Sequence, residues 1–343
     1  MSVTIKDIAK VAGVSHTTVS RALHGHPAIS QETVSRVQQI ANELGYVPNK
    51  AARGLKTRRS GIFGVIVRRI VDPFFGEVLD GIEEVLSERD YSLFLAASQR
   101  DPEREETIVR LMSERRVDGV IICSTQVGEE HRQQLEQFGV PTVLINNQAA
   151  DDITHSVYHD DAEGSRQLTR YLIELGHTKI AYLGNARAGR TTEDRKHGYM
   201  SEMRRQVLPV PPEYVIDGPN GLADGGKIGT QNFLKQSSPP TGIVCYNDVM
   251  AIGAMRTLNE AGFRVPEDIS VTGFDNIDLA AYVTPPLTTF DQPKYELGRQ
   301  AALMMLRLLD KRDDDATTLS SDVITLQGKM ILRHSTAPPA GAA

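Results

Sequence analysis

Cysteine is nearly absent from the sequence, and so is any segment that would direct the chain into a membrane or a secretory pathway. The 343 residues include two cysteines, Cys123 and Cys245, and both stand within short apolar runs. Isolated cysteines of this kind are typical of buried small hydrophobic residues rather than of a disulfide or a metal site. No basic segment followed by an apolar one opens the chain, and no apolar run approaches the length of a membrane span. We therefore expect a soluble, cytoplasmic protein with no membrane partner.

The sequence signatures of catalysis are missing as well. The chain has no HExxH sequence, no nucleophile elbow and no Gly-Lys-Ser/Thr phosphate loop. Residues 184–189 begin and end with glycine but lack the G-x-G-x-x-G spacing that cradles a dinucleotide. His177 and His197 have no partner at a spacing typical of a metal or catalytic site. We predict that the protein is not an enzyme and that it uses no cofactor or metal.

Net charge is distributed unevenly along a chain that is long enough for two or more domains. The whole sequence has a formal charge of −6. Residues 1–60 contain four Lys and five Arg against Asp7, Glu32 and Glu43, which gives +6 and leaves −12 for the remainder. A basic segment on an acidic body indicates that this segment meets a polyanion. Charge alone leaves open an ordinary basic N-terminus.

The first 46 residues show the start and stop signals of three short helices. Thr4 and Asp7 have the spacing of a capping box, and Gly13 is suited to the left-handed conformation that ends a helix. Ser15 and Ser30 are expected to cap the second and third helices, and the third ends before Gly45. Two helices joined by a tight glycine turn predict a helix-turn-helix unit.

The second helix of this unit has one apolar and one polar face. Val19 and Leu23 are four residues apart and are expected to point inward. The polar face is expected to consist of His16, Thr17, Ser20 and Arg21. Side chains of these types can reach base edges in a DNA major groove. An isolated polar face would more simply be solvated, but its place after a glycine-turned helix in a basic segment favours DNA reading.

Four segments together closely resemble the head of the lactose-repressor (LacI) family of bacterial transcriptional regulators. They are residues 3–9 (VTIKDIA), 12–15 (AGVS), 18–21 (TVSR) and 44–49 (LGYVPN). The resemblance implies that the second helix lies in the major groove of an operator, where His16, Thr17 and Arg21 contact bases and Ser20 lies near a phosphate. Thr4 and Ser15 complete the DNA-contacting residues expected in this head, residues 1–46.

Residues 47–60 look like the hinge segment of the same family. Residues 49–59 contain five basic residues and no acidic one, with Gly54 near the middle. Such a segment has too few apolar groups to fold alone, and a plain flexible linker is the alternative. The resemblance implies a hinge helix on DNA, with Leu55 wedged into the minor groove. The DNA contacts expected here are Asn49, Ala52, Arg53, Leu55 and Lys56.

From residue 61 onward, apolar runs alternate with stretches of helical periodicity. The expected strands are 62–67, 92–96, 119–123, 142–145, 179–183, 242–246 and 269–274. Nearly continuous apolar strands separated by helices indicate parallel sheets covered on both faces, and the elements are too many for one sheet. The predicted class is thus an all-α helix-turn-helix head followed by an α/β body with two parallel sheets.

The family resemblance continues to about residue 334 and implies a two-lobed body (residues 61–336) like a periplasmic binding protein. Its chain is expected to cross between the lobes near residues 160, 290 and 320. The first lobe would then comprise about 61–159 and 291–319, and the second about 160–290 and 320–336.

Polar and aromatic side chains follow several of the expected strands. Because ligands of such sheets bind outside the carboxyl ends of the strands, these residues are the predicted effector contacts. They are Asp72, Phe74, Phe75, Asn146, Asn147, Arg195, Asn247 and Asp275. Each alone would more often be a helix cap or a turn residue, or for the aromatics part of the core. Together, an Arg, a carboxylate, amides and an aromatic ring suit the hydroxyl groups of a sugar, with Asp275 and Arg195 the main contacts.

The sign of the effector's charge depends on Arg68 and Arg69, which follow the first expected strand. Asp275 argues against a strongly anionic group at its own position, because two unpaired negative charges in a water-poor cleft repel each other. We expect a neutral, sugar-like effector and place both arginines at a solvated edge. The alternative is that they turn inward to hold an anionic ligand such as a sugar phosphate.

These features predict a repressor of carbohydrate or related metabolic genes that is controlled by a sugar-like effector. A homodimer would read a pseudopalindromic operator. Its interface is expected to include a helical stripe, Val78, Ile82, Val85 and Leu86, unless that stripe belongs to the core of a lobe. A sugar receptor for uptake would share the body but would need a secretory signal and no basic head.

Overall fold

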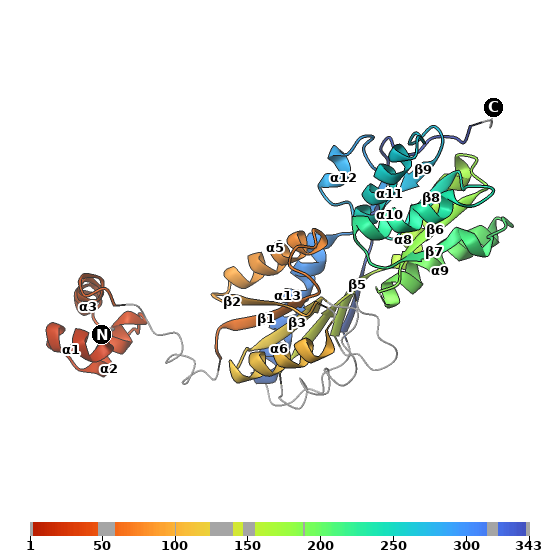
Figure 1. The fold of residues 1–343 in the computed structure, drawn as a ribbon. Coiled ribbons are helices and arrows are strands. Elements are labelled where there is room, and N and C mark those ends of the chain that lie inside the picture. The colour runs from red at the N-terminus through yellow and green to blue at the C-terminus, as the bar shows by residue number, and fades with distance from the viewer. Residues whose placement is uncertain are drawn as a thin grey trace. The chain divides into compact units, whose positions relative to one another are not determined.

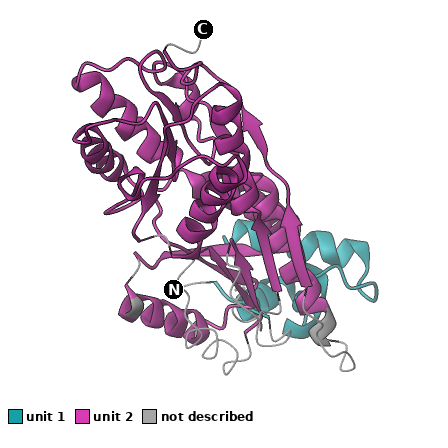
Figure 2. Ribbon diagram, turned by 90° about the vertical axis from the view of Figure 1, so that its right-hand side faces the viewer, with its two compact units in different colours: residues 1–60 teal, residues 61–343 magenta. Residues whose placement is uncertain are grey.

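The computed structural model describes residues 3–46, 59–99, 101–123, 140–146, 155–187, 189–313 and 322–340. The chain divides into two compact units, residues 1–60 and 61–343 (Figure 2). We call the first unit the head and the second the body.

The head consists of three helices, α1 (Ile5–Ala12), α2 (His16–Leu23) and α3 (Gln31–Glu43). The Asp7 carboxylate accepts hydrogen bonds from the backbone N–H of Thr4 at 2.8 Å and from its hydroxyl at 2.7 Å, which fixes the start of α1. Gly13 ends α1 with a φ of +67°, a value that favours glycine. Ser15 caps α2 by accepting a hydrogen bond from the backbone of Thr18. The expected helix-turn-helix is therefore present.

The first lobe of the body, the N-lobe, is built on a six-stranded parallel sheet with the order β11-β5-β4-β3-β1-β2. Four of these strands, β1, β2, β3 and β5, are labelled in Figure 1. Its strands are β1 (Ile62–Val67), β2 (Ser92–Ala97), β3 (Gly119–Cys123), β4 (Thr142–Ile145), β5 (His155–His159) and β11 (Asp322–Leu326). Helices α5 (Phe74–Ser87) and α13 (Lys294–Asp313) pack on one face, and α6 (Pro102–Glu114) packs on the other. Covering both faces accounts for the apolar character of the strands.

The second lobe, the C-lobe, contains a four-stranded parallel sheet with the order β7-β6-β8-β9. Its strands are β6 (Ile180–Asn185), β7 (Val215–Gly218), β8 (Gly242–Cys245) and β9 (Ser270–Thr272). Helices α8 (Asp161–Glu174) and α9 (Arg190–Arg205) cover one face, and α10 (Ala223–Leu234) and α11 (Asp248–Glu260) cover the other. A short helix, α12 (Leu279–Tyr282), follows β9. Two parallel sheets in two lobes confirm the predicted fold class.

The chain passes between the lobes after β5, after β10 (Thr289–Asp291) and before β12 (Lys329–Ile331), which pairs antiparallel with β10. The sequence assigned residues 320–336 to the second lobe, and this was wrong for β11. Strand β11 pairs with β5 at the edge of the N-lobe sheet, so the third crossing lies after Leu326. Pairing with a strand 167 residues earlier leaves no local signal in the sequence. None of the helices in the described part of the chain is long and apolar enough to span a membrane.

The apolar stripe on α5 belongs to the core of the N-lobe. Val78 and Ile82 are completely buried, and they pack in one cluster with residues of α13. Of the two places left open by the sequence, a dimer interface or the core of a lobe, the stripe therefore occupies the core. The two helices approach closely because Gly298 of α13 lies against the backbone of Val78, where an added Cβ would meet the carbonyl oxygen at 1.9 Å.

We expect Gly298→Ala to lower the free energy of unfolding of the body by about 1–3 kcal/mol, because the added methyl group forces α5 and α13 apart. Gly76→Ala, also in α5, is the matched control, because its added Cβ has no neighbour within 4 Å. The control should be neutral or slightly stabilising. Urea denaturation followed by far-UV circular dichroism measures both, and equal stability of the two variants would contradict this packing.

Candidate functional site

The polar face of α2 is exposed as the sequence predicts. His16, Thr17 and Arg21 are exposed, and Ser20 is half-buried. Val19, on the opposite face, is completely buried in the core of the head. Buried Val19 fixes the rotation of α2, so an imidazole, a hydroxyl and a guanidinium project together from its outer surface.

Thr4 and Ser15 are exposed, but their side chains cap helices. The Thr4 hydroxyl donates to Asp7, and the Ser15 hydroxyl accepts from the backbone of Thr18 at 3.0 Å. The remaining predicted DNA contacts, Asn49, Ala52, Arg53, Leu55 and Lys56, lie outside the described residues, as does the predicted effector contact Asn147.

The other seven predicted effector residues converge between the lobes of the body. They line one small pocket of about 50 Å³ at the carboxyl ends of strands from both sheets. The predicted residues in its lining are Asp72, Phe74, Phe75, Asn146, Arg195, Asn247 and Asp275. The sequence therefore located this group of residues, and their role in binding stays a prediction.

Arg195 of α9 is the best-anchored polar group of the pocket. Its Nε donates to Asp161 Oδ1 at 2.8 Å, its Nη1 donates to the carbonyl of Tyr246, and its Nη2 lies 3.5 Å from Asp275 Oδ1. The guanidinium also stacks over the ring of Phe274, with 3.8 Å to the ring centroid. The side chain is 4% exposed. Its two charged partners and the aromatic face compensate for the burial of its charge.

Asp275 connects Arg195 to the segment that crosses between the lobes. Its Oδ1 accepts a hydrogen bond from Gln292 Nε2 at 2.6 Å, and Gln292 Oε1 accepts one from Asn146 Nδ2 of the N-lobe at 3.3 Å. Burial raises the pKa of Asp275 to about 6, although Arg195 opposes this shift. The network continues from one lobe to the other through Gln292.

Lys294 forms a second link beside this network. Its buried ammonium group donates to the carbonyl oxygens of Asp275 at 2.6 Å and Asn276 at 3.2 Å. It also lies 3.2 Å from Glu77 Oε1 of α5. Sequence reasoning missed Gln292 and Lys294, although their place beside the expected crossing near residue 290 could have pointed to them.

The two asparagines of the pocket, Asn146 and Asn247, form hydrogen bonds with backbone groups. Asn247 caps α11 by accepting from the N–H of Met250 at 2.9 Å, and its Nδ2 donates to the Gly221 carbonyl at 3.1 Å. Asn146 Oδ1 accepts from the backbone of His159 at 3.2 Å. Both side chains line the pocket, and Asn247 also has the helix-capping function that the sequence left open.

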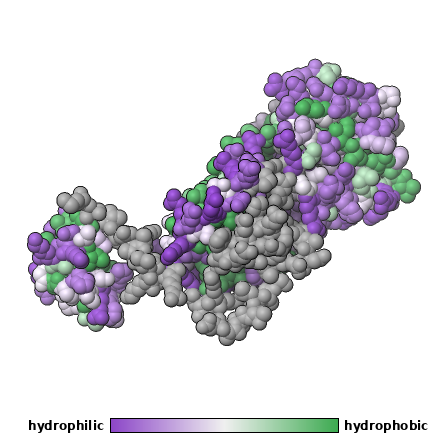
Figure 3. Space-filling model, turned by 60° about the horizontal axis from the view of Figure 1, so that its bottom comes forward, coloured by the Kyte–Doolittle hydropathy of each residue, from purple (hydrophilic) through white to green (hydrophobic). Residues whose placement is uncertain are grey.

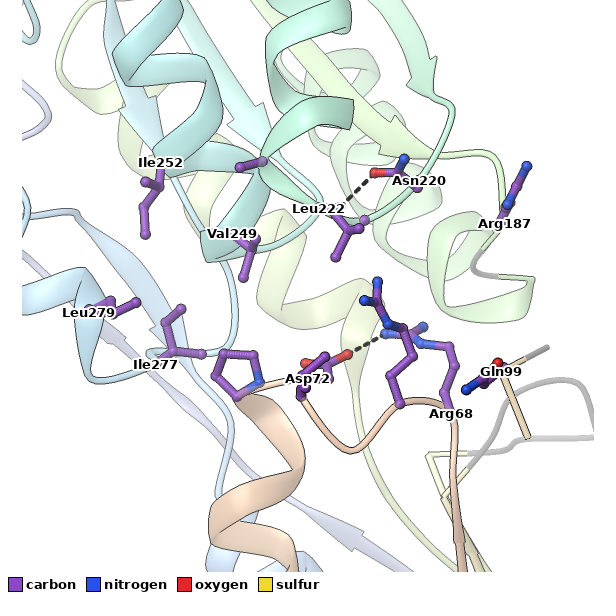
Figure 4. Close-up of a pocket in the computed structure, with 15 residues that line it drawn as sticks. Arg68, Asp72, Gln99, Arg187, Asn220, Leu222, Val249, Ile252, Ile277 and Leu279 are labelled. Atoms are coloured by element: carbon purple, nitrogen blue, oxygen red, sulfur yellow. Dashed lines mark hydrogen bonds and ion pairs between the residues drawn. The ribbon is translucent and has the colours of Figure 1, made fainter. Parts of the chain in front are cut away.

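A larger cleft of about 650 Å³ adjoins the pocket and shares Arg68 and Asp72 with it. Figure 4 shows Asp72 and Arg68 on the N-lobe side, with Asn220, Leu222 and Val249 on the C-lobe side. The rest of the lining combines apolar side chains with Arg69, Gln99 and Arg187.

Arg68 does not lie at a solvated edge, so that expectation was wrong. Its side chain is 16% exposed and its Nη2 donates to Asp72 Oδ2 at 2.7 Å. Burial lowers the pKa of Arg68, but the neighbouring Tyr246 and Asp72 outweigh this effect and raise the net pKa. Asp72, four residues further on, turns the guanidinium inward. Arg69 is exposed, as the sequence predicts.

Asp248 is a completely buried carboxyl group behind the pocket. It accepts hydrogen bonds from the backbone N–H of Ile277 at 2.8 Å and from the Thr289 hydroxyl at 2.5 Å. Burial, with a contribution from the charge of Asp275, raises the pKa of Asp248 to about 8. Within the described part of the chain, no three His, Cys, Asp or Glu side chains are grouped so that they could hold a metal ion.

Two family models match the chain. The model described as bacterial regulatory proteins, lacI family, matches residues 4–49, and the model of a periplasmic binding protein-like domain matches residues 169–336. The "HTH-type transcriptional repressor PurR" of Aliivibrio salmonicida (strain LFI1238) is 34% identical over 313 residues. The match covers 91% of this chain and 94% of that relative.

Solved structures of similar proteins extend over both units. A lac repressor dimer bound to operator and the anti-inducer ONPF has a TM-score of 0.88 and 27% sequence identity, covering 98% of this chain and 100% of that one. A complex of the transcriptional regulator CelR with cellobiose has a TM-score of 0.74 and 28% sequence identity. The match covers 97% of this chain and 99% of that one.

The raised pKa of Asp248 predicts a specific dependence of stability on pH. Its ordinary pKa is 3.8, so between that value and about 8 the folded body holds a proton that the unfolded chain releases. The free energy of unfolding should therefore fall by roughly 1–2 kcal/mol from pH 6.5 to 8, relative to Asp248→Asn. Urea midpoints at several pH values measure the difference. Asp224→Asn removes an exposed carboxyl group and is the control, which should show the same dependence of stability on pH as the wild type. If the free energy of unfolding varies with pH in the same way for the wild type and Asp248→Asn, the raised pKa of Asp248 is refuted.

Proposed function

Because the chain belongs to the lacI family of bacterial regulatory proteins, we propose that α2 reads an inverted-repeat operator and that a small hydroxylated molecule binds between the lobes of the body. The family resemblance recognised in the sequence is thereby confirmed, and the protein is a DNA-binding transcriptional repressor rather than an enzyme.

The observation that carries the DNA-reading proposal is the exposed polar face of α2. His16, Thr17 and Arg21 project from a helix that follows a glycine turn, in a unit of net charge +6. Arg21 is suited to a bidentate contact with guanine, and the hydroxyl groups of Thr17 and Ser20 can contact a base or a phosphate. For the hinge, the proposed contacts, including the Leu55 wedge, rest on the sequence resemblance alone.

The proposed effector is sugar-like, and the regulated genes are those of carbohydrate or related metabolism. The pocket supports this proposal because it offers Asp275 as an acceptor, Arg195 as a donor and the aromatic side chains of Phe74 and Phe75. This combination suits a ring with several hydroxyl groups. The regulator CelR, similar over nearly the whole chain, was solved with cellobiose. Effector binding controls DNA affinity only if the effector binds with different affinity to the DNA-binding state of the protein and to the state that does not bind DNA.

A homodimer is proposed through an apolar surface at the edge of strand β2 and the rim of the cleft. Val71 is 75% exposed and Leu279 is 58% exposed, and both line the large cleft. Val71 also lines a neighbouring cavity along β2, together with exposed Ile70 and Leu111. Apolar side chains lie in groups among hydrophilic ones on the face shown in Figure 3. Exposed apolar residues grouped in this way are typical of protein interfaces, and the similar lac repressor was solved as a dimer.

Arg21→Ala should weaken binding to the selected operator by about 1–3 kcal/mol more than binding to unrelated duplex DNA, because it removes a contact to a base edge. Arg36→Ala removes the same charge from α3 and is the matched control. Operator fragments selected from genomic DNA serve as the probe in gel-shift titrations at several salt concentrations. An equal loss of affinity for operator and for unrelated DNA would show that Arg21 contacts a phosphate rather than a base.

The doubly substituted Val71→Asp/Leu279→Asp protein should sediment as a monomer at concentrations where the wild type is a dimer, because charges in an apolar interface remain unpaired. Val207→Asp/Leu332→Asp changes two other exposed apolar residues and should remain dimeric. Dimerisation of both variants would place the interface elsewhere.

A further inference from the structure

The small pocket between the lobes has too little free volume for the proposed effector. Its volume of about 50 Å³ holds a few water molecules but not a sugar ring, because small-molecule sites usually measure about 300 Å³ or more. A sugar-like molecule can therefore enter only if side chains of the two lobes move apart. Three of the lining side chains, Asn146, Asp275 and Gln292, are joined to one another by hydrogen bonds.

Gln292 is the central member of this group. It lies between β10 and α13, where the chain crosses from the C-lobe to the N-lobe, and is 1% exposed. Its Nε2 donates to Asp275 Oδ1 of the C-lobe at 2.6 Å, and its Oε1 accepts from Asn146 Nδ2 of the N-lobe at 3.3 Å. One amide thus uses its donor for one lobe and its acceptor for the other. A carboxylate has no donor and a hydrocarbon has neither group, so the two bonds together require an amide.

Both partners of Gln292 have a backbone with positive φ. The value is +51° at Asn146 and +107° at Asp275. The value at Asp275 lies outside the left-handed helical region that residues with a Cβ occasionally adopt. Strained backbone of this kind persists where the surrounding contacts hold it, and it is found at ligand clamps and switch regions. Loss of the bond to Gln292 therefore removes one of the contacts that hold Asp275 in place.

The polar groups that would bind the effector are the same ones that Gln292 uses. Asp275 Oδ1 accepts the hydrogen bond from Gln292 and lies 3.5 Å from Arg195 Nη2. A hydroxyl group bound between Asp275 and Arg195 therefore competes with the Gln292 amide. A ring that enters also separates Asp275 from Asn146, and Gln292 cannot then reach both.

We propose that Gln292 is a latch between the lobes, and that the effector binds preferentially to an arrangement of the lobes in which this latch is broken. Gln292 acts through Asp275 and Asn146 and is thus a positioning residue. The inference rests on the proposed effector site and adds the direction of its regulation, because the effector opens the latched arrangement instead of completing it. The difference in pocket volume gives the two arrangements different affinities for the effector, as a shift between them requires.

Gln292→Leu tests the latch without the effector, because leucine has a similar volume but forms neither hydrogen bond. Nitroxide labels at Glu83→Cys of α5 and Arg204→Cys of α9, both exposed positions, report the distance between the lobes of the full chain by double electron–electron resonance. Cys123 and Cys245 are buried and stay unlabelled. An excess of unlabelled protein leaves one labelled subunit in each dimer. We expect the population of a second distance to rise about fivefold relative to the wild-type distance, the effect of one lost hydrogen bond.

Gln300→Leu is the matched control. It is the same substitution in α13, where Gln300 donates to Glu296 and does not line the pocket. The control should keep the wild-type distances. The same distances in all three proteins, or an equal change in Gln292→Leu and the control, overturn the latch.

Gln292→Glu supplies a measurement that a purely structural role would not change. It places a second carboxyl group at hydrogen-bond distance from Asp275, and the two can share a proton in acid but repel each other when both are ionised. In the described part of the chain, the charged groups that act on Asp275 or respond to its charge are Arg195, Lys294, Asp72 and Asp248. They are the same in the wild type, which is therefore the reference at each pH.

Relative to that reference, Gln292→Glu should keep the latched distance at pH 5 and lose it at pH 8. A distance distribution that changes with pH no more than that of the wild type overturns the proposal, even if Gln292→Leu fails to fold.

Calorimetry with glucose, ribose and cellobiose connects the latch to the effector. A sugar that binds the wild type should bind Gln292→Leu more tightly, by up to about fivefold, because less of the variant is latched. A sugar that binds the variant no more tightly than the wild type overturns the proposal. If no sugar binds either protein, the sugar-like effector of the proposed function fails, while the distances still decide the latch.

Discussion

The buried guanidinium of Arg195 is the interaction on which the rest of the effector site depends. It joins the start of α8 through Asp161, the end of β8 through the Tyr246 carbonyl, and the segment after β9 through Asp275. A charge with 4% exposure is stable only with such compensation, so each of these elements must lie where its partner group reaches the guanidinium. The carboxyl-terminal edge of the C-lobe sheet is thus organised around one side chain of α9.

The connection from this centre to the N-lobe is polar rather than apolar. Gln292 joins Asp275 to Asn146, and Lys294 holds the backbone of residues 275 and 276 from the start of α13. Hydrogen bonds of this kind are directional, so a rotation of one lobe must break them or exchange their partners. Apolar cores hold each lobe together, and a short polar series at the crossing sets the angle between them.

Features that depend on neighbouring residues could be predicted from the sequence. The helix caps at Thr4, Ser15 and Ser30 and the glycine turn at Gly13 were recognised because their signals lie within four residues of the helix ends. The pocket residues could be selected because parallel strands bring their carboxyl ends to one edge.

Features that depend on distant partners were missed. The stripe on α5 was ambiguous until α13, more than 200 residues later, covered it. Strand β5, with three polar residues among five, has no apolar pattern and is defined by its neighbours β4 and β11. Arg68 turns inward because its guanidinium group interacts with Asp72 and Tyr246. Tyr246 belongs to the other lobe, so this partner could not be recognised from neighbouring residues.

The late return of the chain to the N-lobe has a consequence for its synthesis. The C-lobe sheet uses residues 180–272 without interruption, so it can assemble soon after these residues leave the ribosome. The N-lobe begins at residue 62 but lacks α13 until residue 313 and its edge strand until residue 326. The lobe that is translated first is therefore completed last. During that interval the apolar face of α5 lacks the helix that covers it in the folded chain. Exposed apolar surface of this kind promotes aggregation of incompletely folded chains, so we expect the face to be a site for chaperone binding during synthesis.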